Sequence, residues 1–305
     1  MRGFTTPALH AMRSDLPRRL GALVLTLGLA FGLSACKTIH VAEHDMLRSN
    51  AALKNPPLSP VFDSAAAQKV WPQASVTEWA VPVAPELALR ALHVQRPGAK
   101  GTVLFFGGNL YRADETAASI MRTWADAPVN LVLVDHRGHG RSPGAPTVAL
   151  VAEDAVKLFD FTRARTTGPL LVGGFSLGSF VAGHVAQHRP VDGLALVGTG
   201  TTVPDLIRGQ LPWYAMPFVS LKIDPALEPV DNLRAVAAVK APTVVVSGAD
   251  DRTTPPAAAR RVFEALPSPA KRWVLVPQAG HNGLLQKPET REALTALART
   301  LTGAN

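Results

Sequence analysis

The sequence predicts an α/β domain in which helices cover both faces of a mostly parallel sheet. Short apolar runs rich in β-branched residues alternate with longer segments of helical pattern, which is the order of successive β–α units. Glycine and polar residues follow several of these runs, at the edge where open α/β sheets carry their sites. The chain has 305 residues, enough for one such domain with a large core.

The units of this alternation can be placed in order along the chain. Two front strands, residues 77–81 and 87–94, are expected to be antiparallel. The inner strands are expected to end near Phe106, Asp135, Phe175, Val197, Gly248 and Val276. Helices are expected over residues 113–124, 153–165, 177–188, 256–266 and 288–301. Between residues 198 and 239 the alternation lapses, so this stretch is expected to stand outside the regular layers.

A G-x-S-x-G motif, Gly174-Phe175-Ser176-Leu177-Gly178, lies between a predicted strand and a predicted helix. This is the setting of a nucleophile elbow, a turn too sharp for side chains at its two glycines. Such a turn exposes the serine hydroxyl above the sheet in a strained conformation. The motif is short enough to arise as a chance glycine-rich strand exit. Its interpretation therefore depends on whether the chain supplies partners for Ser176.

Candidate partners follow the motif in the order acid, then histidine. Asp250 and Asp251 come directly after the β-branched run that ends at Gly248, and His281 follows the next predicted strand. A serine hydroxyl needs a base to take its proton, and a carboxylate can orient that base. The spacing from the strand does not separate the two adjacent aspartates, so both remain candidates.

Five ordered segments carry a family resemblance. They are the elbow, Gly248-Ala249-Asp250-Asp251 with Pro255, Gly280-His281, the strand and turn at residues 102–109, and the D-x-R-G-x-G-x-S turn at residues 135–142. Together they resemble the α/β-hydrolase superfamily, in particular its serine aminopeptidase and lysophospholipase-like branch. The resemblance covers roughly residues 75 to 303. It implies an α/β-hydrolase fold with a short cap at about residues 200–239.

The resemblance also implies the roles of the site residues. Ser176, Asp251 and His281 would form a catalytic triad, with Asp250 as the alternative acid. Backbone N–H groups at Asn109, or one residue away, and at Leu177 would form the oxyanion hole. Gly107 stands where the family usually has histidine, but only a backbone donor is needed there. This chemistry requires no metal and no cofactor.

The implied activity is hydrolysis of carboxylic esters with lipid or small acyl groups, because the predicted cap is rich in apolar and aromatic residues such as Leu206 and Phe218. Those residues are equally explained by packing of the cap on the core. Serine aminopeptidase or thioesterase activity uses the same machinery and stays open. A catalytically silent binding or scaffold lipoprotein is the alternative from another class, although the complete triad argues against it.

The front of the chain predicts export and lipidation. Arg18-Arg19 precede an uncharged apolar run that ends in Leu33-Ser34-Ala35-Cys36, which matches a bacterial lipoprotein signal. We expect a signal peptide over residues 1–35, lipidation of Cys36, and a tether over residues 36–75 before the hydrolase domain at 76–305. A plain signal-anchor helix is the alternative, and Met12 is an alternative start.

The expected location is a bacterial membrane, facing the periplasm. Lys37 rather than aspartate after Cys36 favours the outer membrane. The formal net charge is +8, but the cationic residues are scattered and form no block, so no nucleic-acid partner is expected. The expected partners are an acyl substrate and the membrane; the sequence gives no oligomeric state.

Overall fold

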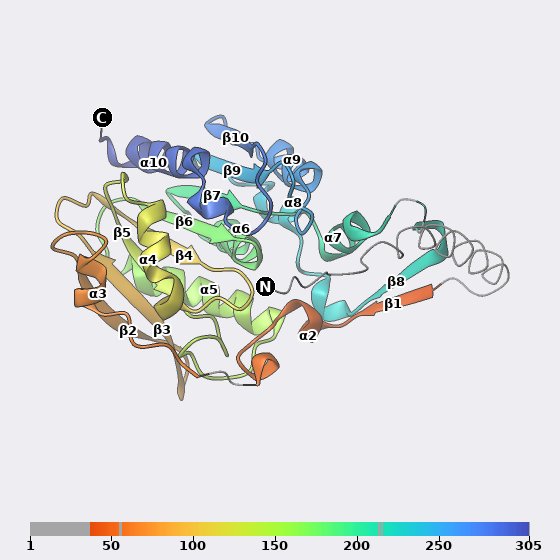
Figure 1. Ribbon diagram of the computed structural model, residues 1–305, viewed down its shortest axis with the longest axis horizontal. Coiled ribbons are helices and arrows are strands. Elements are labelled where there is room, and N and C mark those ends of the chain that lie inside the picture. The colour runs from red at the N-terminus through yellow and green to blue at the C-terminus, as the bar shows by residue number, and fades with distance from the viewer. Residues whose placement is uncertain (1–36, 55–56, 213, 215, 305) are drawn as a thin grey trace, which may run out of the picture.

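An eight-stranded sheet forms the centre of the structure (Figure 1). The computed structural model describes residues 37–54, 57–212, 214 and 216–304. The strand order is β10-β9-β7-β6-β4-β5-β3-β2; the β2–β3 and β3–β5 pairs are antiparallel, and all other pairs in this sheet are parallel. The strands are β2 (Ser75–Ala84), β3 (Leu87–Gln95), β4 (Gly101–Phe106), β5 (Val129–Val134), β6 (Leu170–Phe175), β7 (Gly193–Val197), β9 (Thr243–Gly248) and β10 (Lys271–Val276). The predicted fold class is confirmed.

Helices cover both faces of this sheet, as the alternation predicts. The helices of the described residues are α2 (Glu43–Met46), α3 (Ser64–Gln68), α4 (Ala113–Thr123), α5 (Val148–Arg163), α6 (Leu177–His188), α7 (Val203–Gln210), α8 (Asn232–Val236), α9 (Pro256–Ala265) and α10 (Pro288–Thr302), of which α2 and α7 lie outside the two helical layers. On one face, Met121 of α4 and Leu294 of α10 share a buried apolar cluster with Phe105. On the other, Leu158 of α5 shares a cluster with Phe106. Phe105 and Phe106 are neighbours in β4, and they reach opposite faces because side chains alternate along a strand.

Buried charge pairs hold the turn after β5, the segment with the D-x-R-G-x-G-x-S pattern. Asp135 is fully buried and accepts hydrogen bonds from the backbone N–H groups of Ala113 and Arg141, at 2.7 and 3.0 Å. Arg137 donates two hydrogen bonds to Asp154 of α5, at 2.8 and 2.7 Å, and both side chains are buried. Removing one member would leave the other charge buried and unpaired, which is strongly destabilising. The segment therefore fixes this turn to α4 and α5.

The segment before β2 carries regular structure where a tether over residues 36–75 was expected. Its first strand, β1 (Lys37–Val41), pairs in parallel with β8 (Val219–Ile223), and Lys37 lies opposite Val219. The two strands form a ribbon of their own, which extends away from the main sheet beyond α7 (Figure 1). The pairing joins segments far apart in the chain, so local sequence patterns give no sign of it.

The chain between β7 and β9 forms the predicted cap, and β1 completes it. The cap contains α7, β8 and α8. Val203 of α7 and Leu227 pack with Val41 of β1 in a small apolar cluster separate from those on the two faces of the main sheet. This burial ties the N-terminal strand to the cap, because apolar area removed from water stabilises the contact in proportion to its size.

The predicted signal peptide, residues 1–35, and the predicted lipidation site, Cys36, lie outside the described residues. Export and lipidation therefore stay predictions. Across the part of the chain that the structure describes, no helix combines the length and the apolar character that crossing a bilayer requires.

Candidate active site

The predicted nucleophile elbow lies between β6 and α6, with Ser176 at its apex. Ser176 has φ 54° and ψ −121°, a conformation that residues with side chains rarely adopt. A Cβ atom at Gly174 would collide with the carbonyl group of Gly178, and one at Gly178 would collide with the carbonyl group of Phe106. Both glycines are therefore required by the close approach of α6 to β6 and β4, as the motif predicts.

The structure brings Ser176, His281 and Asp251 together, although they are far apart in the sequence. His281 lies in the loop after β10, and its Nε2 atom is 2.9 Å from Ser176 Oγ. Its Nδ1 atom is 2.8 Å from Asp251 Oδ2, in the loop after β9. The imidazole ring also packs against Phe175, with ring centroids 5.0 Å apart. A continuous hydrogen-bonded series thus runs from the carboxylate through the imidazole to the serine hydroxyl.

The geometry distinguishes between the two adjacent aspartates. Asp251 is 3% exposed and accepts hydrogen bonds from the Thr253 and Thr254 backbone N–H groups, both at 2.8 Å, and from Thr254 Oγ1 at 2.7 Å. Burial raises the pKa of the Asp251 carboxyl, but the hydrogen bonds from His281 and Thr254 outweigh it and hold that pKa below its usual value. Asp250 is exposed to solvent. Asp251 is the acid behind the imidazole, and Thr254 is a site residue that the sequence reasoning missed.

The two residues predicted for the oxyanion hole, Asn109 and Leu177, line the same cavity as Ser176. Leu177 is the first residue of α6, where backbone N–H groups lack partners within the helix and the helix dipole favours negative charge. Asn109 lies in the loop after β4, next to Leu110, which has a strained φ of 65°. Gly108 lies so close to the elbow that a Cβ there would be 3.3 Å from the Ser176 Cβ. The arrangement can present backbone donors to an oxyanion beside the serine.

The side chain of Asn109 is held by the N-terminal segment, which the sequence reasoning also missed. Asn109 Nδ2 donates to the carbonyl oxygen of Met46 at 2.8 Å, and Asn109 Oδ1 accepts from the backbone N–H of Arg48 at 2.8 Å. Both polar atoms of the amide are thus used. These two hydrogen bonds fix the loop after β4 to a segment that enters from the cap side.

A largely apolar cavity of about 590 Å³ opens beside Ser176. Its lining includes Leu177 and Asn109, and its walls come from the stretch 40–48 and from the cap, including α7. A smaller cavity of about 100 Å³ continues from it toward α5 and shares Leu47 and Phe180 with it. The serine therefore faces a space that can take an extended apolar group.

Comparison with known proteins shows what the chain is similar to. The family "Serine aminopeptidase, S33" matches residues 97–229, which include Ser176. Among solved structures, the esterase Pf2001 of Pyrococcus furiosus superposes with a TM-score of 0.63 at 15% identity, over 81% of this chain and 99% of that one. Mouse α/β-hydrolase domain-containing protein 10 gives a TM-score of 0.56 at 20% identity, over 75% and 98%. This chain has the α/β-hydrolase fold, and residues 97–229 are similar in sequence to that superfamily.

Similar sequences include proteins from distant organisms. Uncharacterized protein Rv2307c of Mycobacterium tuberculosis is 31% identical over 180 residues, which are 57% of this chain and 60% of that protein. Human protein ABHD12B is 27% identical over 214 residues, which are 63% of this chain and 59% of that protein. The chain thus spans about three fifths of the length of these curated relatives.

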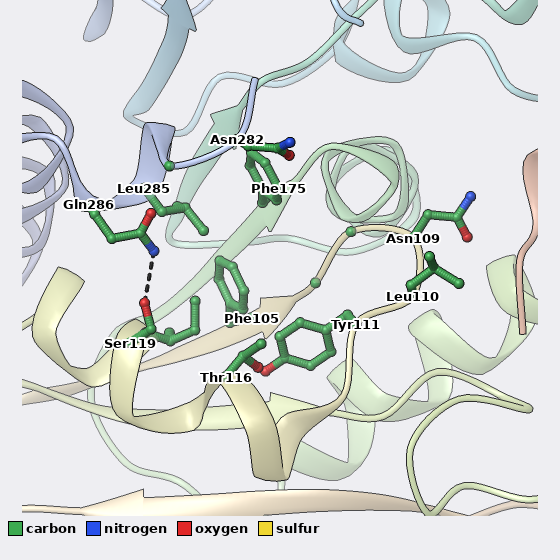
Figure 2. Close-up of a pocket in the computed structure, with 14 residues that line it drawn as sticks. Phe105, Asn109, Leu110, Tyr111, Thr116, Ser119, Phe175, Asn282, Leu285 and Gln286 are labelled. Carbon is green, nitrogen blue, oxygen red and sulfur yellow. Dashed lines mark hydrogen bonds between the residues drawn. The ribbon is translucent and has the colours of Figure 1, made fainter. Parts of the chain in front are cut away.

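A second cavity, about 250 Å³, lies on the other side of the loop after β4. Figure 2 shows Asn109 and Leu110 at one side of it, Phe105 and Tyr111 along its floor, and Gln286 with Ser119 opposite. Gln286 Nε2 donates to Ser119 Oγ at 2.8 Å (Figure 2). The lining here is more polar than that beside Ser176. Among the described residues, no group of three or more histidine, cysteine or acidic side chains is arranged to hold a metal ion.

Proposed function

We propose that this hydrolase is a serine esterase that cleaves carboxylic esters with apolar acyl groups, from lipids or from smaller acyl compounds. The observation that carries the proposal is the hydrogen-bonded series from Asp251 through His281 to Ser176. A serine outside such a series is a weak nucleophile, whereas here both the base and the group that orients it are in contact.

The mechanism follows from the contacts. Asp251 accepts the Nδ1–H of His281, so the free Nε2 atom can take the proton of Ser176 as Oγ bonds to the ester carbonyl carbon. The N–H groups at Asn109 and Leu177 stabilise the oxyanion, each contributing on the order of 3 kcal/mol. His281 then protonates the departing alcohol as its C–O bond breaks. A water molecule, activated by the same imidazole, releases the acid from the acyl-enzyme.

The shape of the site supports an acyl substrate. The apolar cavity beside Ser176 and its extension toward α5 can bury a hydrocarbon chain. Structural neighbours at 15% identity include the Pyrococcus furiosus esterase and Est1E from Butyrivibrio proteoclasticus with bound ferulic acid. Amide and thioester bonds suit the same nucleophile, so aminopeptidase and thioesterase activities are the alternatives.

Two measurements test the proposal. A fluorophosphonate probe is expected to label the hydrolase, and labelling should vanish in Ser176→Ala, whereas a folded but unreactive parent protein would indicate a scaffold. Chromogenic esters of increasing acyl length, assayed beside aminoacyl anilides, then identify the bond. Cleavage of the anilides alone would replace the esterase proposal with an aminopeptidase.

We also propose that the hydrolase is exported and anchored to a bacterial membrane through lipid on Cys36. Cys36 is the only cysteine of the sequence and follows the signal-like run directly. Metabolic labelling with a palmitate analogue is expected to mark the parent chain and not Cys36→Ala. Equal labelling of both would contradict the anchor.

A further inference from the structure

The cap carries a cluster of exposed apolar side chains. Tyr214, Met216 and Phe218 are 64%, 46% and 66% exposed, and we call these three residues the cap tip. Seven large apolar side chains are exposed in the described part of the chain, and three of them stand here within five residues. Scattered exposed apolar residues are normal, but a cluster marks a contact with a partner or a membrane.

The position of the cap tip indicates its partner. Phe218 is followed directly by Val219, which lies opposite Lys37 in the β1–β8 ribbon, and Lys37 is the residue after Cys36. Lys37, the first described residue, therefore lies beside the cap tip. A lipid on Cys36 would bring this surface, rather than another face of the molecule, to the bilayer.

Cationic side chains surround the same surface. Lys37 and Lys222 are exposed on the two strands of the ribbon, and exposed Arg208, which also forms an ion pair with Asp205 at 3.9 Å, lines a pocket together with Met216 and Val219. Apolar side chains flanked by cations suit the interface of a bilayer with anionic head groups. Within the described residues, β1 and β8 pair only with each other, and a pair of strands alone is marginally stable in water.

The cap tip also adjoins the walls of the cavity beside Ser176. His40 and Val41 of β1 line that cavity, as do Ile207 and Gln210 at the end of α7. The ribbon and α7 thus connect the exposed surface with the cavity that would take the acyl group.

We propose that the cap tip binds the lipid bilayer, so that the membrane contacts the hydrolase at a second point beside the anchor. Apolar side chains of the cap tip enter the head-group region while Lys37, Arg208 and Lys222 face anionic lipids. The orientation directs the wall formed by β1 and α7 toward the lipid surface. The inference builds on the proposed anchor, but its test does not require esterase activity.

A single fluorescent label measures this contact. In the lipid-anchored full chain, Cys36 is blocked, so Phe218→Cys provides one reactive thiol for an environment-sensitive dye. The labelled protein is reconstituted in vesicles of phosphatidylethanolamine and phosphatidylglycerol that contain lipids with a quencher near the head group. The matched control is Thr300→Cys, on the exposed side of α10 and far from the ribbon (Figure 1).

We expect the dye at position 218 to shift to the blue and lose most of its emission to the lipid-borne quencher, while the dye at 300 keeps its emission. The same two dye positions, 218 and 300, in a Cys36→Ala background measure the contact between the cap tip and the bilayer independently of lipidation at Cys36. Equal emission at both positions in vesicles with and without the quencher would overturn the proposal. A blue shift without lipid quenching would assign the cap tip to a second copy of the chain and would equally overturn it.

A second measurement relates the surface to the proposed function. Replacing both Met216 and Phe218 by serine is expected to lower hydrolysis of a vesicle-borne ester about tenfold or more, because two apolar side chains no longer enter the bilayer. Hydrolysis of a short soluble ester should be unchanged, since neither residue lines the cavity beside Ser176. Loss of both activities in the variant would show that the cap tip supports the fold. A parent chain that hydrolyses no ester, but whose dye at position 218 is quenched by the lipid, would contradict only the esterase proposal.

Discussion

Replacing Asp251 by asparagine tests the proposed mechanism most directly, because the surroundings of this carboxylate dictate how an amide must sit. Asp251 Oδ1 accepts the two backbone N–H groups of Thr253 and Thr254, while Oδ2 faces His281 Nδ1 at 2.8 Å and Thr254 Oγ1 at 2.7 Å. An amide oxygen that keeps the two backbone hydrogen bonds leaves its NH2 group pointing at the imidazole. Nδ1 must then accept, and the proton moves to Nε2, where it faces Ser176 and blocks proton transfer.

The opposite orientation of the amide is also costly. It restores the correct tautomer of His281 but points the NH2 group of the substituted side chain at the backbone N–H groups of Thr253 and Thr254. Of these two N–H groups, that of Thr254 is buried whereas Thr253 is exposed to solvent, so the cost is about 1–3 kcal/mol for the Thr254 donor and less for the Thr253 donor. Since a free-energy difference of about 1.4 kcal/mol corresponds to about a tenfold change in population, the productive orientation is rare. Losing the negative charge beside the imidazolium adds to this, so we expect kcat/KM to fall by on the order of 10⁴.

The assay is ester hydrolysis with Asp250→Asn as the matched control. Asp250 is exposed and adjacent in sequence, so its replacement removes the same charge without touching His281 and should leave kcat/KM within about twofold. Thermal unfolding of both variants separates loss of activity from loss of structure. The proposed role of this carboxylate would be refuted if Asp251→Asn is folded at the assay temperature and its kcat/KM lies within about tenfold of the parent value. An equal loss in Asp250→Asn would refute it as well.

Other contacts of the structure give three more expected outcomes. Asn109→Ala removes both hydrogen bonds to the N-terminal segment and should cost about 1–3 kcal/mol of unfolding free energy by denaturant titration, with Asn109→Asp, which keeps the acceptor, losing less. Arg137→Met leaves Asp154 buried and unpaired and should lower the free energy of unfolding by about 3–5 kcal/mol; an unchanged melting temperature would contradict this account. Because the folded-state pKa of Asp251 is lowered, its stabilising contribution is present above the unfolded pKa of about 3.9 and is lost as the pH falls through the folded value. The stability difference between the parent and Asp251→Asn should therefore shrink on acidification below about pH 4, as followed by chemical unfolding at several pH values.

The sequence predicts those parts of this molecule that are encoded locally. The elbow at Ser176 is marked by two glycines between a strand and a helix, and His281 by its place after a strand. Asp250 and Asp251 both follow β9 directly, so the sequence pattern left them equivalent. Only their burial distinguishes them. Thr254 had only a weak local signal, since an aspartate such as Asp251 commonly accepts a hydrogen bond from the backbone two residues on and so forms a turn next to Thr254.

The N-terminal segment was misjudged for a different physical reason. Its proline-rich stretch breaks local helices and strands, which favoured a tether, but strand pairing is satisfied by partners anywhere in the chain. β1 finds its partner in the cap, and Met46 and Arg48 find theirs in Asn109. The signal that was present is the β-branched content of Thr38, Ile39 and Val41, but without a visible partner it predicts no strand.

This N-terminal segment joins three parts of the candidate site. It contributes one strand of the ribbon with β8, part of the wall of the cavity beside Ser176, and both hydrogen bonds to the Asn109 side chain. Met46, which binds Asn109, lies only ten residues after the proposed anchor at Cys36. A chain that begins at residue 76 would lack all three contributions, although its triad residues are complete. The loop proposed to supply an oxyanion donor is thus held by the segment nearest the proposed anchor, and these anchor-proximal residues belong to the candidate site as much as the strand ends that carry the proposed triad.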